Sequence, residues 1–290
     1  MFTIANILTG FNLLFGVASI IFTFSGRLEY AVIAIILGAI CDFFDGFAAR
    51  LLKQQGELGK QLDSLADMVT FGAAPGVIIF VLLILSGAAN ILVEVGGFPT
   101  DIWLEGTMGH SVHYWISVYF NDLVGNQTPY LPSHFYGVYL YLPFVALLIP
   151  FFSMFRLAKF NLDERQSTGF IGLPTPANSL FFASFALLLW DGFALENWKS
   201  SLSMLLIDAY VLVPLTVLFS LLLIAEIPLF SLKFQNFKWK DNKVRYIFLV
   251  LSFFALLVFW VWAIPLIIVL YLLLSIVSKQ GGKGKMEKSN

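Results

Sequence analysis

The chain has 290 residues, of which 59% are hydrophobic and only 12% are charged, and its formal net charge is −1. A soluble domain carries about a quarter charged residues, so this composition excludes a protein surrounded by water on all sides. It predicts a membrane protein. The single cysteine, Cys41, excludes an intramolecular disulfide and a site built from several thiolates.

Eight apolar stretches are candidates for membrane crossing, which takes roughly 20 mostly apolar residues. The first has no basic region before it and no small-residue cleavage site after it, so we expect a retained helix. The last two form one block interrupted near Trp260–Pro265, where a tight hairpin is expected; one long helix there would give seven spans. We therefore expect an all-α polytopic membrane protein with spans at about 4–25, 29–50, 64–86, 137–158, 174–191, 205–228, 246–260 and 263–278.

Basic residues predict the orientation, because Lys and Arg stay on the cytoplasmic side. They cluster in four places, at 50–60, 156–165, 233–245 and from 279 onward. With eight spans all four clusters lie on one side, and only Arg27 and Lys199 lie opposite. Both termini are therefore expected in the cytoplasm.

Two boundaries divide the chain into three parts. Residues 1–235 are expected to form the main membrane domain, 236–278 a C-terminal hairpin, and 279–290 a disordered cytoplasmic tail rich in Gly, Lys and Ser. Segment 87–136 lies on the outer side, and its stretch from His110 to Leu123 resembles an interfacial amphipathic helix. His110 and His113 could pair on a metal, but too few further ligands accompany them, so an interfacial role is favoured.

Four aspartates stand where two of the expected spans meet the cytoplasm. Asp42 and Asp45 are three residues apart, and Asp63 and Asp67 are four apart, so each pair shares a helix face. A short loop joins the two helices, which lets the two faces meet. Ionisable groups in apolar spans are costly, so they indicate function.

Four carboxylates in a low-dielectric site need cations to compensate their charge. All-oxygen ligation suits hard ions, so we expect two Mg²⁺ or Mn²⁺ ions that grip a pyrophosphate. The alternative is that the carboxylates are structural and pair with Arg50, Lys53 and Lys60. Four acids with small residues threaded between them favour the metal site.

The spacing Asp42-x2-Asp45-Gly46-x2-Ala49-Arg50-x8-Gly59-x3-Asp63-x3-Asp67 resembles the signature of the CDP-alcohol phosphotransferase family. The resemblance implies a six-helix catalytic core, usually a homodimer, with a two-metal site at the cytoplasmic edge. It implies that Asp42, Asp45 and Asp63 bind one ion, and that Asp42, Asp63 and Asp67 bind the other. Asp67 corresponds to the catalytic base.

The same resemblance implies the residues that hold the CDP group. Gly46, Ala49, Arg50 and Gly59 correspond to the family's CDP-binding positions. At the N-terminus, Asn6-Ile7-Leu8-Thr9-x2-Asn12 is similar to the family's opening helix, with Ala5 where Pro is usual. Contacts from Asn6 and Thr9 to the nucleotide are therefore expected as well.

Two further segments resemble the branch of the family that makes phosphatidylserine. Asp67–Pro75 is similar to that branch's run after the signature, and 155–161 (FRLAKFN) with 170–177 (FIGLPTPA) resembles its later elements. Lys159 stands where Arg is common, which keeps the charge but loses the planar fork. Arg156, Lys159 and Asn161 are thus expected to bind the carboxylate of serine or a lipid phosphate, although positive-inside topology alone also explains the two basic residues.

These resemblances predict an enzyme that moves the phosphatidyl group of CDP-diacylglycerol to L-serine, by direct attack, in a prokaryotic plasma membrane. The nearer alternative is a sister enzyme that uses glycerol-3-phosphate or an inositol phosphate, which would need more basic residues for its acceptor. The farther alternative is a transporter that uses intramembrane carboxylates. It would place acids at several depths on broken helices, whereas these four gather on two adjacent helices.

Overall fold

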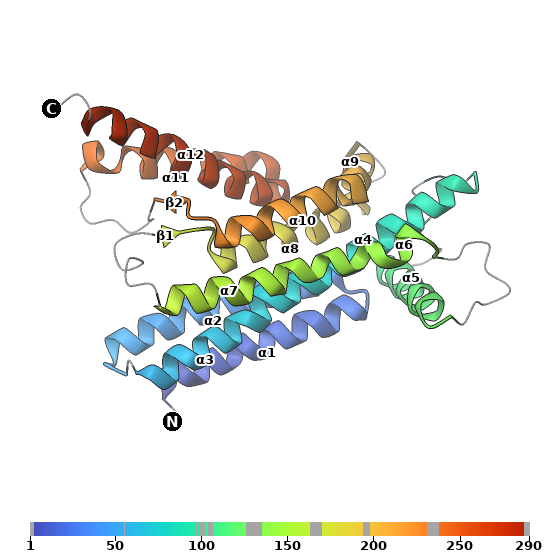
Figure 1. The fold of residues 1–290 in the computed structure, drawn as a ribbon, viewed down its shortest axis with the longest axis horizontal. Helices are drawn as coiled ribbons and strands as arrows, with labels where there is room; N and C mark the ends of the chain where they lie inside the picture. Colours follow the sequence, from blue (N-terminus) through green and yellow to red (C-terminus); the bar gives the residue numbers. More distant parts are fainter. Residues whose placement is uncertain are drawn as a thin grey trace.

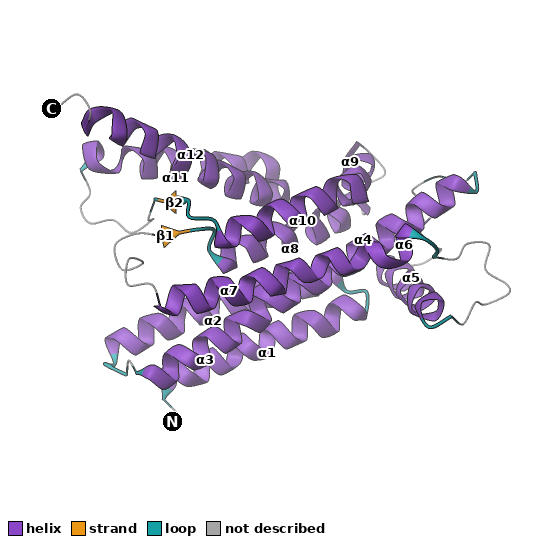
Figure 2. Cartoon of the chain, viewed as in Figure 1, coloured by secondary structure: helices purple, strands orange, loops and turns teal. Residues whose placement is uncertain are grey.

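The computed structural model describes residues 3–54, 56–96, 98, 102–103, 107–125, 135–162, 170–193, 198–230 and 238–286. Within them the fold is a bundle of long helices accompanied by one pair of two-residue strands (Figure 1; Figure 2). The all-helical class expected from the apolar pattern is confirmed.

The first two helices form a tightly packed pair. Helix α1 covers Ile4–Phe24 and α2 covers Leu28–Leu51, close to the predicted spans. Their turn contains Gly26, whose φ of 77° suits a residue without a side chain. A Cβ at this position would also lie 2.3 Å from the carbonyl oxygen of Gly109, which rules out a larger residue.

The third span is longer than predicted. One unbroken helical segment runs over Glu57–Glu94 as α3 (Glu57–Asp67), the π-helical segment η1 (Met68–Ala73) and α4 (Ala74–Glu94). The prediction began at 64 because the first turns of α3 are polar. Those turns are largely exposed, so their polar side chains remain solvated.

The π-helical segment follows Asp67 directly. The backbone N–H of Ala74 donates to the carbonyl of Val69, five residues earlier. Pro75 explains the widening, because a proline ring clashes with the carbonyl four residues before it in a regular α-helix. Segments of this kind occur mostly at functional sites.

The predicted amphipathic helix at the outer end is present as α5 (Met108–Leu123). Its apolar face, however, packs on the protein: Trp115 and Tyr119 are buried, and Tyr119 donates to the carbonyl of Leu140 at 2.9 Å. Burial raises the pKa of Tyr119 to about 12, so its hydroxyl stays protonated as a donor. His110 and His113 lie on the exposed face of α5.

The fourth span is built from three consecutive helical pieces. Helix α6 (Val138–Tyr141), the 3-10 helix η3 (Leu142–Leu147) and α7 (Leu148–Leu162) follow one another along the bundle. A Cβ at Gly76 would lie 2.9 Å from the ring of Pro150, so α4 and η3–α7 approach closely. Helix α7 therefore runs antiparallel beside the Glu57–Glu94 segment.

Helix α8 (Thr175–Phe193) lies inside the bundle, where it contacts α2, α4 and η1. It follows strand β1 (Phe170–Ile171), which pairs antiparallel with β2 (Pro228–Leu229), so that Phe170 lies opposite Leu229. These strands tie the beginning of α8 to the chain that follows α10.

The predicted span at 205–228 is corrected by the structure. It consists of α9 (Trp198–Ile207) and α10 (Ala209–Ile224), which meet at an angle of 55°. Asp208 causes the break, because its carboxylate accepts a hydrogen bond from the N–H of Tyr210 at 2.8 Å and caps α10 as a new helix.

The C-terminal apolar block is a hairpin, as expected. Helix α11 (Trp239–Phe259) ends at the 3-10 turn η5 (Trp260–Trp262), and α12 (Ala263–Met286) returns beside it (Figure 1). Helix α12 thus continues past 278, into the stretch where the sequence predicts a disordered tail. At the turn, the indole of Trp262 donates to Asp191 at 2.7 Å.

Five helical segments are long and apolar enough to cross a membrane, and α9 with α10 make a sixth if the bent pair is one span. This result does not confirm the predicted number of eight spans. Helix α8 falls outside this set because polar residues such as Asn178 and Ser184 lower its mean hydropathy. The segments are 4–24, 28–51, 57–94, 138–162 and 242–277, the last of which contains both arms of the C-terminal hairpin.

Both ends of the described chain lie at the same end of the bundle, together with the α2–α3 turn, the end of α7 and the start of α11 (Figure 1). Helices α5 and α6 lie at the opposite end. The described parts of the basic clusters therefore gather at one end, as the charge pattern predicts.

Candidate functional site

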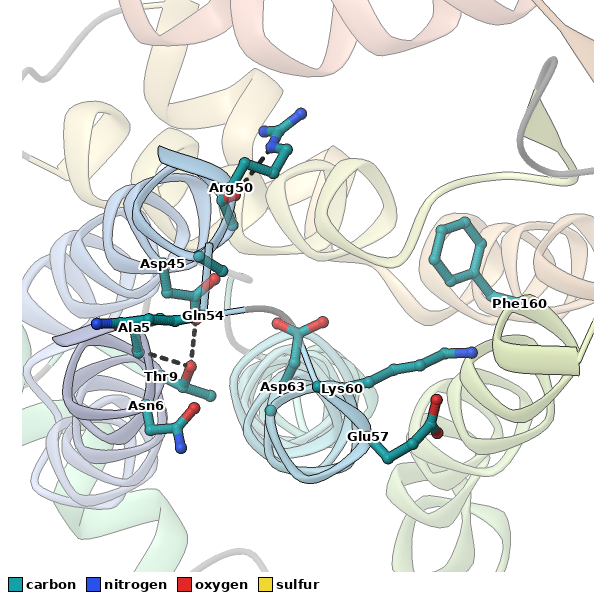
Figure 3. Close-up of a pocket in the computed structure, with 14 residues that line it drawn as sticks. Ala5, Asn6, Thr9, Asp45, Arg50, Gln54, Glu57, Lys60, Asp63 and Phe160 are labelled. Carbon is teal, nitrogen blue, oxygen red and sulfur yellow. Dashed lines mark hydrogen bonds between the residues drawn. The ribbon is translucent and has the colours of Figure 1, made fainter. Parts of the chain in front are cut away.

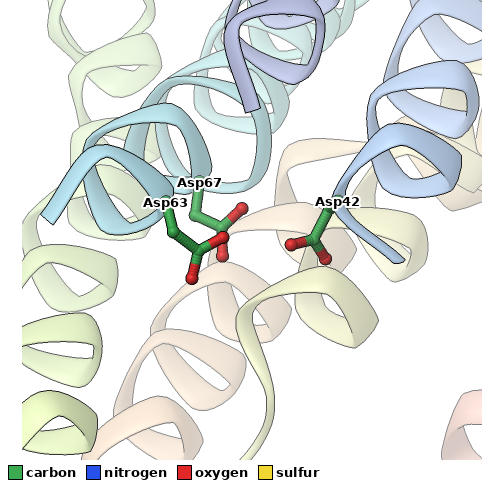
Figure 4. Close-up of side chains that lie close together, drawn as sticks. All are labelled: Asp42, Asp63 and Asp67. Atoms are coloured by element: carbon green, nitrogen blue, oxygen red, sulfur yellow. The ribbon is translucent and has the colours of Figure 1, made fainter. Parts of the chain in front are cut away.

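Three of the four aspartates converge between α2 and α3. Carboxylate oxygens of Asp42, Asp63 and Asp67 all lie within 4.8 Å of one another. Figure 4 shows Asp63 and Asp67 on one helix facing Asp42 on the other. Asp67 is 8% exposed, so the cluster extends from the edge of the bundle into its interior.

Asp45 lies apart from this group. It is buried, and its Oδ2 accepts a hydrogen bond of 2.6 Å from the hydroxyl of Thr9 on α1 (Figure 3). The structure therefore brings together the three acids that the resemblance assigns to one ion, with the fourth one turn away on α2. Metal binding by either set stays a prediction.

The carboxylate oxygens of Asp42, Asp63 and Asp67 are suitable ligands for a hard cation. Three carboxylates in a partly buried site repel one another unless positive charge compensates them, and their oxygens are the ligands that Mg²⁺ and Mn²⁺ prefer. The structural alternative required pairing with nearby basic residues. Arg50 instead donates to the carbonyl of Gly46 at 2.9 Å, and Lys60 to that of Asn161 at 2.7 Å. Within the described ranges, no ion pair joins the aspartates to Arg50, Lys53 or Lys60.

A cleft of about 760 Å³ opens beside the aspartates, between α1, α2, α3 and the end of α7 (Figure 3). All six residues predicted to hold CDP line this cleft, and Asp45 and Asp63 form part of its wall. The six come from three separate stretches of sequence: Asn6, Thr9, Gly46, Ala49, Arg50 and Gly59.

Glycine at two of these positions keeps the cleft open. A Cβ at Gly46 would meet nothing within 4 Å, so any side chain there would project into the cleft. A Cβ at Gly59 would lie 3.3 Å from the Oδ1 of Asn6 and would crowd that amide. The missing side chains thus leave room for a group of nucleotide size.

Sequence reasoning missed several residues of the cleft. Gln54, Glu57 and Lys60 flank the α2–α3 turn, and Phe160 comes from α7, 97 positions after Asp63. The first three could have been found from their place in the short loop between the two acidic helices. Phe160 could not, because nothing in the sequence predicts which face of α7 meets α3.

The family model described as CDP-alcohol phosphatidyltransferase matches residues 2–103. This stretch contains all four aspartates and the cleft residues from α1, α2 and α3. The chain carries a domain of the CDP-alcohol phosphatidyltransferase family.

Similar proteins align beyond this CDP-alcohol phosphatidyltransferase domain. A CDP-diacylglycerol–serine O-phosphatidyltransferase of Bacillus subtilis is 29% identical over 181 residues, which are 61% of this chain and 67% of that protein. An archaetidylserine synthase of Methanothermobacter thermautotrophicus is 33% identical over 63% of this chain and 57% of its own. A Saccharomyces cerevisiae CDP-diacylglycerol–serine O-phosphatidyltransferase is 42% identical over 79 residues, 26% of this chain and 29% of the yeast protein.

Beyond the matched domain, Arg156 on α7 is the predicted acceptor residue that the structure sets apart. It is 4% exposed, and its Nε donates to the carbonyl of Leu173 at 3.3 Å. Helix α7 runs antiparallel to the acidic segment, and Ser153 lies against Gly72 while Asn161 bonds Ser64. This register places Arg156 between those two contacts, level with the residues just after Asp67.

The turn that offers the Leu173 carbonyl to Arg156 requires a glycine. Gly172 has a φ of 78°, and a Cβ there would lie 2.8 Å from the carbonyl oxygen of Leu223. Its N–H donates to Ile227 at 2.8 Å. The FIGLP segment, first noted only as a resemblance, thus holds the beginning of α8 against α10.

The other two predicted acceptor residues have different surroundings. Lys159 is exposed and forms an ion pair of 2.9 Å with Glu226. Asn161 donates from its amide to Ser64 at 2.7 Å, and its carbonyl accepts from Lys60. The Lys159 ammonium already pairs with a carboxylate and the Asn161 amide with a hydroxyl, whereas the buried Arg156 has no carboxylate partner among the described residues, so Arg156 is the strongest of the three candidates.

Asn178 is a polar residue that sequence reasoning overlooked. It lies in the first turn of α8, is fully buried, and neither end of its amide has a partner among the described residues. Burying an unpaired amide costs on the order of 1–3 kcal/mol, so polar contents are expected beside it. An Asn early in an apolar stretch was the available signal.

Proposed function

We propose that the chain transfers the phosphatidyl group of CDP-diacylglycerol to the hydroxyl of L-serine, giving phosphatidylserine and CMP. The observation that carries this proposal is the cleft in which all six expected CDP contacts meet beside the carboxylate cluster. The names of the Bacillus and yeast relatives supply the donor and the acceptor. Residues 1–235 would form the catalytic unit.

The donor would bind with its nucleotide in the cleft and its acyl chains in the bilayer. Gly46 and Gly59 give the nucleotide access to the backbone, and Arg50 at the cleft wall offers a positive charge for phosphate. Asp42, Asp45, Asp63 and Asp67 would hold two divalent ions, Mg²⁺ or Mn²⁺, which neutralise the pyrophosphate and stabilise the leaving CMP.

Asp67 would act as the base. It accepts the proton of the serine hydroxyl while the serine oxygen forms a bond to the lipid-side phosphorus. The bond from that phosphorus to the oxygen of CMP breaks, and CMP leaves with the electron pair. We propose direct attack, because the carboxylates of the site are already assigned to metal binding and proton transfer.

Arg156 would recognise the carboxylate of serine. Arg156 is buried without a carboxylate partner among the described residues, which is costly for a guanidinium, so an anionic group of the acceptor would compensate it. Its level along α7, just beyond Asp67, suits a small molecule whose hydroxyl must reach that base. Lys159 and Asn161 would form the outer wall of this acceptor site.

We further propose that the chain crosses the plasma membrane of a prokaryote eight times, acts as a homodimer, and opens its site to the cytoplasm. The shared location of both chain ends supports an even number of crossings (Figure 1). The gathering of Lys and Arg at that same end supports the orientation.

The test measures CMP release by purified protein given CDP-diacylglycerol and one acceptor at a time. We expect CMP with L-serine, and little or none with glycerol-3-phosphate, inositol phosphate, inositol or choline. An equal rate with another acceptor would overturn serine as the substrate. Ion flux through proteoliposomes without any CMP would instead favour the transporter.

A further inference from the structure

Asn12 on α1 contacts the proposed base directly. Its Nδ2 donates a hydrogen bond of 2.9 Å to the Oδ1 of Asp67, and its side chain is fully buried. Asn12 does not line the cleft for the nucleotide. Its contact with the base is therefore separate from the walls of the nucleotide cleft.

The orientation of the Asn12 amide follows from charge. If the amide were reversed, its Oδ1 would face the carboxylate of Asp67, and two acceptors would repel. The observed orientation leaves Oδ1 without a partner among the described residues. The Asn12 Oδ1 is thus buried without a partner among the described residues, at a cost of about 1–3 kcal/mol, while the Nδ2 donates to Asp67.

The backbone that carries Asn12 is also fixed. Thr70, in the π-helical segment, donates from its hydroxyl to the carbonyl of Asn12 at 2.8 Å. A Cβ at Gly16 would lie 2.4 Å from the Thr70 Oγ1, and one at Gly38 would lie 2.6 Å from the Thr70 Cγ2. These two glycines, one on α1 and one on α2, let both helices close around Thr70 directly beneath the acids.

We propose that Asn12 is a positioning residue that holds the Asp67 carboxylate in the rotation needed to face Asp42 and Asp63. This inference rests on the proposed function for its role in transfer, whereas its effect on the carboxylate cluster does not depend on the acceptor. Residues that orient metal ligands typically change metal affinity or activity about 10–100-fold when they are removed.

The test compares Asn12→Leu, which keeps the branched shape and the number of side-chain heavy atoms but removes the donor, with Asn12→Ala, which removes both the shape and the donor. Ser19→Ala is the matched control, because Ser19 is also buried on α1 and its hydroxyl has no partner among the described residues. Mn²⁺ binding to the full-length protein, without substrate, is measured from the electron paramagnetic resonance signal of the free ion. Steady-state kinetics and thermal unfolding follow on the same samples.

We expect both Asn12 variants to bind Mn²⁺ about 10–100-fold more weakly. We also expect kcat to fall by a similar factor, while the KM for CDP-diacylglycerol stays within about twofold. The control should match the wild type. A purely structural role predicts that Asn12→Leu keeps the wild-type affinity and kcat, and that result would overturn the proposal. If the leucine variant does not fold, Asn12→Ala carries the same comparison.

The two proposals fail in different ways. If serine yields no CMP but the Asn12 variants lose Mn²⁺ affinity, the proposed acceptor is wrong and the positioning role stands. If the wild-type protein binds no Mn²⁺, the positioning role is overturned.

Discussion

The Nε of Arg156 lies 3.3 Å from the carbonyl oxygen of Leu173 and joins α7 to the beginning of α8. This contact orients the guanidinium but leaves most of its donors for another group, since an arginine has five N–H donors. Two elements that are separate in the sequence thus orient the guanidinium that we propose binds the carboxylate of serine.

Arg156→Gln should raise the KM for serine. Losing one partner of a buried charge pair costs about 2–5 kcal/mol, which corresponds to an increase of about 30-fold or more. The KM for CDP-diacylglycerol should change little. Lys159→Gln is the control, because an exposed ion pair contributes only about 0–1 kcal/mol, and its KM for serine should change by less than about fivefold. Equal effects of the two substitutions would contradict the assignment.

Asp67→Asn should reduce kcat by about 10²–10⁴-fold, the usual contribution of a general base. Serine-dependent CMP release measures the effect, and thermal unfolding verifies that the protein is folded. Glu94→Gln, at the opposite end of the bundle, should keep wild-type activity. Wild-type turnover by the Asp67 variant would remove it from the mechanism.

Chelation should abolish CMP release, because the clustered carboxylates need cations to bind a pyrophosphate. Treatment with EDTA followed by gel filtration, then addition of Mg²⁺ or Mn²⁺, tests this expectation. Activity should return with either ion. Full activity in the chelated protein would show that the aspartates work without metal.

Gly46→Leu should weaken binding of the donor, because the new side chain would occupy the cleft. A loss of about 1–3 kcal/mol raises the KM for CDP-diacylglycerol about 5–150-fold. Gly10→Leu is the matched control, since a Cβ at Gly10 also meets nothing within 4 Å but the residue does not line the cleft. An unchanged KM in the Gly46 variant would place the nucleotide elsewhere.

Trp262→Phe should destabilise the protein without changing the activity of the folded fraction. The indole hydrogen bond to Asp191, which also pairs with Lys199 at 2.9 Å, joins the C-terminal hairpin to α8. A partly exposed hydrogen bond to a charged group contributes about 1 kcal/mol, so thermal unfolding in detergent should shift downward by a few degrees. Trp260→Phe, at a residue that is 76% exposed, should leave the unfolding temperature unchanged.

The fold was predictable from the sequence wherever one physical signal dominated. The apolar stretches of α1 and α2 have little polar content, so their spans were close to the observed helices. The spacing of the aspartates determined which helix face each occupies, and the structure brings Asp42, Asp63 and Asp67 together on facing helices.

Contacts between helices that are distant in sequence were not predictable. Thr9 was expected to touch the nucleotide, and its hydroxyl also bonds Asp45. Asn12 appeared only as part of a resemblance, because a single sequence does not specify toward which neighbour a polar residue in an apolar helix points. The break at Asp208 was missed because its flanking residues are apolar on both sides, and helix capping decided the outcome.

The π-helical segment Met68–Ala73 has a consequence for how the chain tolerates change. Each residue of an α-helix turns the chain by about 100°, so the wider turn shifts the angular phase between the two halves of the long helix. Inserting a further residue there, with no second wide turn to absorb it, would rotate Asp63 and Asp67 by about 100° relative to the buried faces of α4. We therefore expect this stretch to accept substitutions more readily than changes in length.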